Sequence, residues 1–181
     1  MPYTTIDNSE LYFQCKNYVG SSSAQSITLD GSENMQPDFI WFKNREASGR
    51  HQLYDSVRGA TKLINSDSSD GEQTVSYFTS FDSDGFTIPS GSSALNGGSQ
   101  NIIAWCWKES TTAGFDMVTY TGDASTDRSI SHGLSVAPKT MIIKNRSGSH
   151  AWMVYHDVLG SNSGTTRRFL QLDNGNGYNN G

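Results

Sequence analysis

The most distinctive pattern that could do chemistry is a basic motif that occurs twice, each time before an aromatic segment. Lys43-Asn44-Arg45 and Lys144-Asn145-Arg146 lie 101 residues apart, and Tyr54 or Tyr155 follows. Lysine, arginine and tyrosine side chains can bind an anionic sugar or a carboxylate. A set kept in both copies also suits a structural role, because asparagine tolerates turns and a basic side chain can pair with Asp55 across strands. We favour the structural interpretation.

Four residues near polar turns are the candidates for binding a ligand. Trp152 begins an apolar segment directly after the polar turn RSGSH, so we expect this tryptophan to be exposed and able to stack on a sugar. Arg50, His51 and His150 lie at polar loops that differ between the two copies, and such loops carry recognition more often than the shared scaffold does.

The remaining tryptophans and both cysteines lie in apolar segments. Trp41, Trp105 and Trp107 are flanked by apolar residues on both sides, so we expect them in the core. Cys15 and Cys106 are expected as two buried, reduced thiols. The alternative is one disulfide that joins the first and last strands of the same unit.

Signals for metals and catalysis are weak. Asp82 and Asp84 have the opening spacing of a calcium loop, but no glutamate closes a twelve-residue loop, so a β-turn with Gly85 is the simpler interpretation. The sequence shows no nucleophile elbow, zinc-protease motif or phosphate loop. We therefore assign no catalytic residue, expect no cofactor or other metal, and expect that the chain is not an enzyme.

The composition indicates an all-β protein. Hydrophobic residues make up 34%, charged residues only 17%, and 18 glycines accompany many serines and asparagines. Such residues punctuate short aromatic and β-branched runs, a pattern typical of an antiparallel, jelly-roll-like β-sandwich. The net charge of −5 argues against a nucleic-acid partner, and no apolar stretch is long enough for insertion in a membrane.

The repeat divides the chain into two units. We expect a first β-sandwich unit at 1–110 and a second, shorter copy at 111–181, which lacks counterparts of 75–91 and 101–110. An open sheet edge is unfavourable to expose. We therefore expect either a longer natural chain or completion of the second copy by packing on the first unit or by strands from a partner. Expected strands are 11–19, 25–29, 38–43, 51–56, 62–65, 76–81, 85–88, 101–108, 115–120, 128–131, 140–144, 151–157 and 167–171.

The linked motifs QPDFIWFKNR and LYDSVRGATK, with the later segment SVAPKTMIIKNRSGSHAWMVYHDVLG, resemble a family of tailed-phage virion proteins. Members of this family are common in marine and cyanobacterial phages. The resemblance covers essentially the whole chain. It implies a structural or tail-fibre-like protein of the virion, and it brings no established catalytic residues.

We therefore expect a non-enzymatic virion surface protein, assembled in the host cytoplasm as part of a tail fibre or capsid fibre. Its expected role is attachment to host-surface glycans, with other virion proteins as partners. We expect a homo-oligomer, with a trimer favoured. The alternatives are a capsid decoration protein that binds no receptor, a bacterial carbohydrate-binding module, and a glycan depolymerase.

Overall fold

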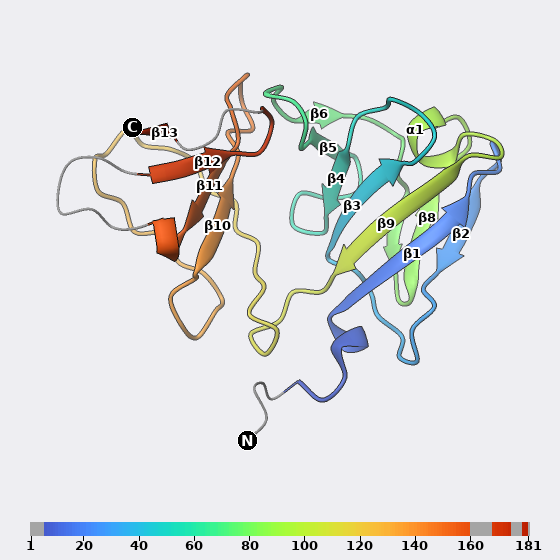
Figure 1. The fold of residues 1–181 in the computed structure, drawn as a ribbon, viewed down its shortest axis with the longest axis horizontal. Helices are drawn as coiled ribbons and strands as arrows, with labels where there is room; N and C mark the ends of the chain where they lie inside the picture. The colour runs from blue at the N-terminus through green and yellow to red at the C-terminus, as the bar shows by residue number, and fades with distance from the viewer. Residues whose placement is uncertain (1–5, 160–167, 175–178, 181) are drawn as a thin grey trace.

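The computed structural model describes residues 6–159, 168–174 and 179–180. Figure 1 shows antiparallel sheets connected by turns, with very little helix. The elements are η1 (Ser9–Leu11), β1 (Phe13–Val19), β2 (Gln25–Thr28), β3 (Phe39–Asn44), β4 (Gln52–Asp55), β5 (Lys62–Asn65), β6 (Gln73–Thr74), β7 (Ser80–Asp82), β8 (Gly85–Ile88), α1 (Ser93–Asn96), β9 (Asn101–Trp107), β10 (Thr140–Ile143), β11 (Met153–His156), η2 (Asp157–Leu159), β12 (Arg168–Gln171) and β13 (Asn179–Asn180).

The first unit, from η1 to β9, is a two-layer sandwich. A six-stranded sheet in the order β1-β9-β3-β4-β5-β6 packs on a three-stranded sheet in the order β2-β8-β7. Phe86 of β8 lies 5.1 Å from the Phe42 ring of β3 and 5.8 Å from the Tyr18 ring of β1, measured between ring centroids. The prediction of an all-β antiparallel sandwich is confirmed.

Strand β9 carries the alternation that builds this core. Its residues Ile102, Ala104 and Cys106 are completely buried between the sheets, whereas Trp105 and Trp107 point to the outer face and are half-buried. The prediction that these tryptophans belong to the enclosed core was therefore wrong. The residues of β9 are apolar on both faces because Trp105 and Trp107 belong to a layer of aromatic side chains on the outer face of the sheet, outside the sandwich core.

The two cysteines lie on neighbouring strands but on opposite faces. In the antiparallel pair of β1 and β9, Cys15 is opposite Trp105 and Cys106 is opposite Gln14. Residues on opposite faces cannot form a disulfide, and both thiols are free. Cys106 is buried as expected, whereas the expectation of burial was wrong for Cys15, whose side chain is exposed.

The second unit, from β10 to β13, repeats one part of the first. Its order β10-β11-β12-β13 corresponds to β3-β4-β5-β6. The register is also the same: Phe39 pairs with Asp55 in the first unit, and the corresponding Thr140 pairs with His156 in the second. The sequence repeat is therefore a repeated hydrogen-bonded ladder.

Two predicted strands of the second copy, 115–120 and 128–131, are wrong, because the structure has no strand at either place. They correspond to β1 and β2, which in the first unit pair with β9 and β8. No described strand of the second unit takes the place of β8 or β9. A strand without a partner leaves its backbone groups to water, so these segments stay irregular. The predicted strand 76–81 is likewise mostly loop, and only its end lies in β7.

The hairpin of β7 and β8 requires glycine at one position. Gly85 has a φ of +119°, and a Cβ atom there would lie 2.0 Å from the carbonyl oxygen of Ile27 in β2. Glycine therefore permits both the backbone conformation and the close approach of β8 to β2.

We predict that Gly85→Ala destabilises the fold by about 2–3 kcal/mol, because strain and a backbone clash act together. Gly91→Ala is the matched control: Gly91 has a φ of +90° but no atom near its missing Cβ, so strain alone should cost about 1 kcal/mol. Urea unfolding of both variants measures the difference. Equal losses would contradict the role of the close approach.

Candidate functional site

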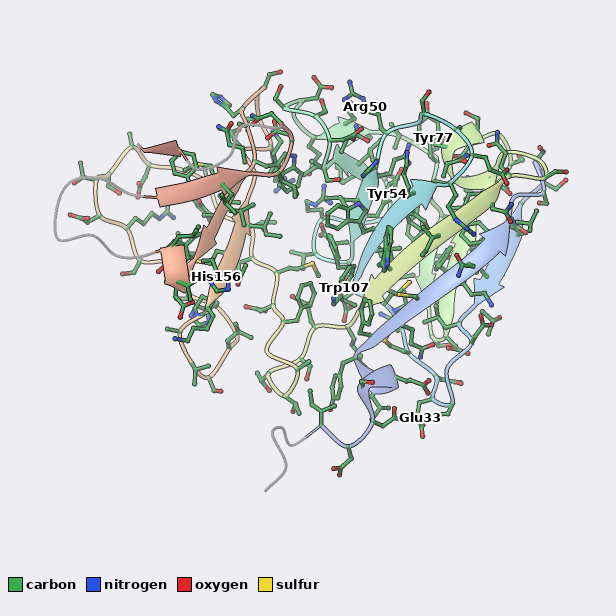
Figure 2. All side chains as sticks on the ribbon, in the orientation of Figure 1. Glu33, Arg50, Tyr54, Tyr77, Trp107 and His156 are labelled. Atoms are coloured by element: carbon green, nitrogen blue, oxygen red, sulfur yellow. The ribbon has the colours of Figure 1, made fainter. Side chains whose placement is uncertain are left out.

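The four predicted ligand-binding residues come together where the two units meet. Arg50 and His51 precede β4, His150 and Trp152 precede β11, and the loop 66–72 lies between them; we call this region the junction. Arg50 Nη1 donates to the carbonyl oxygen of Asp67 at 3.1 Å, and the His51 backbone N–H donates to Asp67 Oδ1 at 3.0 Å. Figure 2 shows Arg50 at this end of the first unit.

Trp152 is buried, with 6% of its surface exposed, so the expectation that it is an exposed stacking residue was wrong. Its Nε1 donates to the carbonyl oxygens of Asn65 at 3.0 Å and Ser68 at 3.1 Å. Its ring packs with Leu53 and Ile64 on the outer face of the first unit. Trp152 therefore anchors the second unit to the first and cannot stack on a ligand in this arrangement.

The repeated basic motif shapes the same turn in both units. Lys43 Nζ donates to the carbonyl oxygen of Gly49 at 2.9 Å, and Lys144 Nζ donates to that of His150 at 2.7 Å. The two acceptors are equivalent positions of the repeat.

The asparagines of the motif behave in the same way. Asn44 Oδ1 accepts the backbone N–H of Glu46 at 3.0 Å, and Asn145 Oδ1 accepts that of Ser147 at 2.9 Å. These contacts support the structural interpretation of the motif, because the lysine and the asparagine of each copy bond to their own loop.

The aromatic and acidic partners proposed for this motif have other roles. The expected cross-strand pairing of Asp55 with the motif was wrong, because Asp55 pairs with Arg58. Tyr54 is buried and donates its hydroxyl to Gln52 Oε1 at 3.1 Å, whereas Tyr155 is half-buried. Arg45 is exposed. In the first unit the motif therefore offers no convergent anion site.

An ion-pair network closes the junction. Arg146 of the second unit donates Nε and Nη2 to the two carboxylate oxygens of Glu72, at 2.7 and 3.0 Å. Arg58 of the first unit approaches the same carboxylate at 3.4 Å. Burial alone would raise the pKa of Glu72, but the hydrogen bonds and charges of Arg146 and Arg58 together hold this pKa below its ordinary value.

A second surface feature is the outer face of the six-stranded sheet, which carries five aromatic residues; we call it the aromatic face. Phe13 lies 4.8 Å from Trp107, Phe39 lies 5.4 Å from Trp107, and Trp41 lies 6.4 Å from Trp105, between ring centroids. The second unit packs on the half that carries Phe39 and Trp41. The half on β1 and β9 is open, and Phe13 is 37% exposed. Figure 2 shows Trp107 at the end of β9.

Two carboxyl groups border this face at a shallow hollow of about 200 Å³. Glu109 and Asp116 line it together with Phe115, whose ring lies 6.4 Å from that of Trp107. Burial raises the pKa of Glu109, and the negative charges of Asp38 and Asp116 raise it further. A hydrogen bond from the Met117 N–H lowers this pKa but does not cancel the rise. The oxygens of two neighbouring carboxyl groups can accept hydrogen bonds from sugar hydroxyls.

The sequence interpretation missed these acids because they match no motif. They meet only because the chain turns back after β9, where Ser110 forms an isolated bridge with Phe115.

The weak calcium candidates are both engaged by hydrogen bonds, Asp82 within its own hairpin and Asp84 with the segment before β3. Asp82 accepts hydrogen bonds from the hydroxyls of Ser80 and Thr87, both at 2.7 Å, and Asp84 accepts the Met35 N–H at 3.2 Å. These bonds favour the β-turn interpretation. No three histidine, cysteine or acidic residues gather as a possible metal site within the described ranges. Those ranges also contain no helix suited to crossing a membrane.

The comparisons with known proteins give one match. A family model described as "Domain of unknown function (DUF7483)" matches residues 8–180. No curated protein and no solved structure matches the chain.

Substitution of Trp152 tests whether its ring anchors the second unit to the first. We predict that Trp152→Ala destabilises the second unit by about 3–5 kcal/mol, whereas Trp152→Phe, which keeps an aromatic ring but loses the Nε1–H donor and part of the ring volume, costs about 1–2 kcal/mol. Chemical unfolding followed by circular dichroism measures both. Val158→Ala, at an exposed position, is the near-neutral control. Unchanged stability of Trp152→Ala would show that Trp152 is not an anchor.

The Glu72 ion pairs should make the junction sensitive to acid. Because its folded pKa is lowered, the Glu72 carboxylate stabilises the fold fully above its unfolded pKa of about 4.3, and this stabilisation is lost as the pH falls through the lower folded value. We predict that wild type exceeds Glu72→Gln in melting temperature at pH 7 and that the gap closes below about pH 4. Glu33→Gln, at an exposed side chain, should show little gap at any pH. A gap that is constant with pH would contradict this account.

Proposed function

The chain belongs to the DUF7483 family, and we propose that it is a non-enzymatic surface protein of a phage virion. In this proposal it forms part of a tail fibre or capsid fibre and contributes to attachment to host-surface glycans. The motifs QPDFIWFKNR and LYDSVRGATK, with their resemblance to tailed-phage virion proteins, support the location on the virion.

The observation that carries the attachment role is the open half of the aromatic face beside the Glu109 and Asp116 carboxyls. Aromatic side chains offer flat apolar surfaces, and a few polar groups beside them fix the orientation of a ligand. Phe13, Trp105 and Trp107 are partly exposed on a sheet, so they are held in place before any ligand arrives. A sugar ring would stack there while its hydroxyls bond to the carboxyls.

A capsid decoration protein is the second candidate. It is favoured by the exposed apolar residues of the second unit, among them Met141, Ile142 and Ile143, which suit assembly with other virion proteins. Both candidates include self-assembly, and the homo-oligomer, with a trimer favoured, stays a prediction. Host-cell binding distinguishes the two roles.

We predict that the fluorescently labelled chain binds cyanobacterial cells and that periodate oxidation of cell-surface sugars abolishes this binding. Phe13→Ala should weaken binding about tenfold, because it removes one stacking surface from the open half. Tyr77→Ala removes an aromatic side chain of similar exposure from the connection between β6 and β7, so it should leave binding unchanged. Circular dichroism of each variant confirms that it is folded.

The results also decide between the candidates. Binding that survives periodate, or that is equally weakened by both variants, would contradict a glycan site on the aromatic face. No binding to any cell tested, combined with binding to tail-less capsids, would favour the decoration role.

A further inference from the structure

Strand β10 has one paired side and one open side. It pairs with β11, and no described strand pairs with its other side. Its counterpart β3 has both sides paired, with β4 on one side and β9 on the other. The first unit therefore shows what occupies this position when the same ladder is complete.

The side chains of β10 are apolar and uncovered. Met141, Ile142 and Ile143 are 38%, 53% and 39% exposed, whereas Ile40 and Phe42, the counterparts of Met141 and Ile143, are completely buried. The register of β10 against β11 is that of β3 against β4, so Met141 and Ile143 belong to the face that the sandwich core covers in the first unit. Burial of these apolar groups against a partner would be favourable.

The edge strand β1 of the six-stranded sheet is protected, in contrast to β10. Strand β1 ends the six-stranded sheet, and its Lys16 pairs with Asp30 beside the strand. Gln14 of β1 bonds to the backbone of Glu33 and Gly31. Charged and capped edges resist the addition of strands. Strand β10 consists of Thr140 and three apolar residues and has no such charge.

We propose that β10 accepts a strand from a different partner protein, not from a second copy of this chain, antiparallel to β10 and with the residue pattern of β9. In the first unit Cys106 lies opposite Ile40 and Ala104 opposite Phe42, with Trp105 opposite Trp41 on the outer face. The partner strand therefore carries small or aliphatic residues opposite Met141 and Ile143 and an aromatic residue opposite Ile142. Backbone hydrogen bonds supply affinity, and this alternation supplies register. The inference goes beyond the attachment role and does not depend on it.

The test uses a labelled peptide with residues 99–110 of this chain and Cys106 replaced by serine, titrated into the full chain and followed by fluorescence anisotropy. We expect saturable one-to-one binding. A peptide of the same composition with the alternation scrambled should bind at least tenfold more weakly. Hydrogen exchange of the complex should show new protection in β10.

Two matched variants locate the peptide. Ile143→Lys introduces into β10 an inward charge like that of Lys16 in β1, and it should weaken binding at least tenfold. Val19→Lys places the same charge on the β1 edge, at a residue that is also exposed, and should leave binding unchanged. Both substitutions are at exposed positions, and circular dichroism checks that each variant folds.

Three results would overturn the proposal. Binding that Ile143→Lys does not affect would place the peptide elsewhere. Binding lost in Val19→Lys would assign it to the β1 edge. A stable dimer or trimer of the chain alone that Ile143→Lys dissociates would show that a second copy, through β10, is the occupant.

Discussion

The structure depends on one strand that is hydrogen-bonded on both sides. Strand β9 pairs with β1 and β3, and its buried residues Ile102, Ala104 and Cys106 lie on the core side of the sandwich. A central strand of this kind satisfies two sets of backbone groups at once and buries one side-chain face. It also positions Trp105 and Trp107 on the outer face. The closed core and the aromatic face are therefore two consequences of the same alternation.

In the second unit no described strand takes this place beside the same ladder. Strands β10 to β13 keep the pairing of β3 to β6, so short-range pairing does not need β9. The counterparts of β1 and β2 do not form, and the face of Met141 and Ile143 stays exposed. The second unit buries little apolar surface within itself. It gains stability instead from the junction, through the Trp152 ring and the ion pair of Arg146 with Glu72. An almost fully buried tryptophan and a bidentate pair are strong contacts for a small unit.

The sequence predicted local alternation well and tertiary context poorly. The bounds expected for β5 and β8 are those observed, because apolar alternation and flanking turn residues define both strands. Segments 115–120 and 128–131 have similar patterns and are not strands, because strand formation requires a partner that a pattern does not reveal. Trp152 was misjudged for a related reason: it follows a polar turn, and only the fold shows that this turn docks on Leu53 and Ile64. Arg50, His51 and His150 were predicted in or directly beside polar loops and do gather at the junction. Glu109 and Asp116 were missed because a turn in the chain brings them together.

The most direct test of this account is amide hydrogen exchange of the chain alone, compared between β3 and β10. If β9 is what completes the ladder, the amides of β3 that point toward β9 exchange only on global unfolding, whereas the equivalent amides of β10, which point away from β11, exchange rapidly. Equal, strong protection of both strands would contradict the central claim, because it would mean that the second unit is already closed on that side.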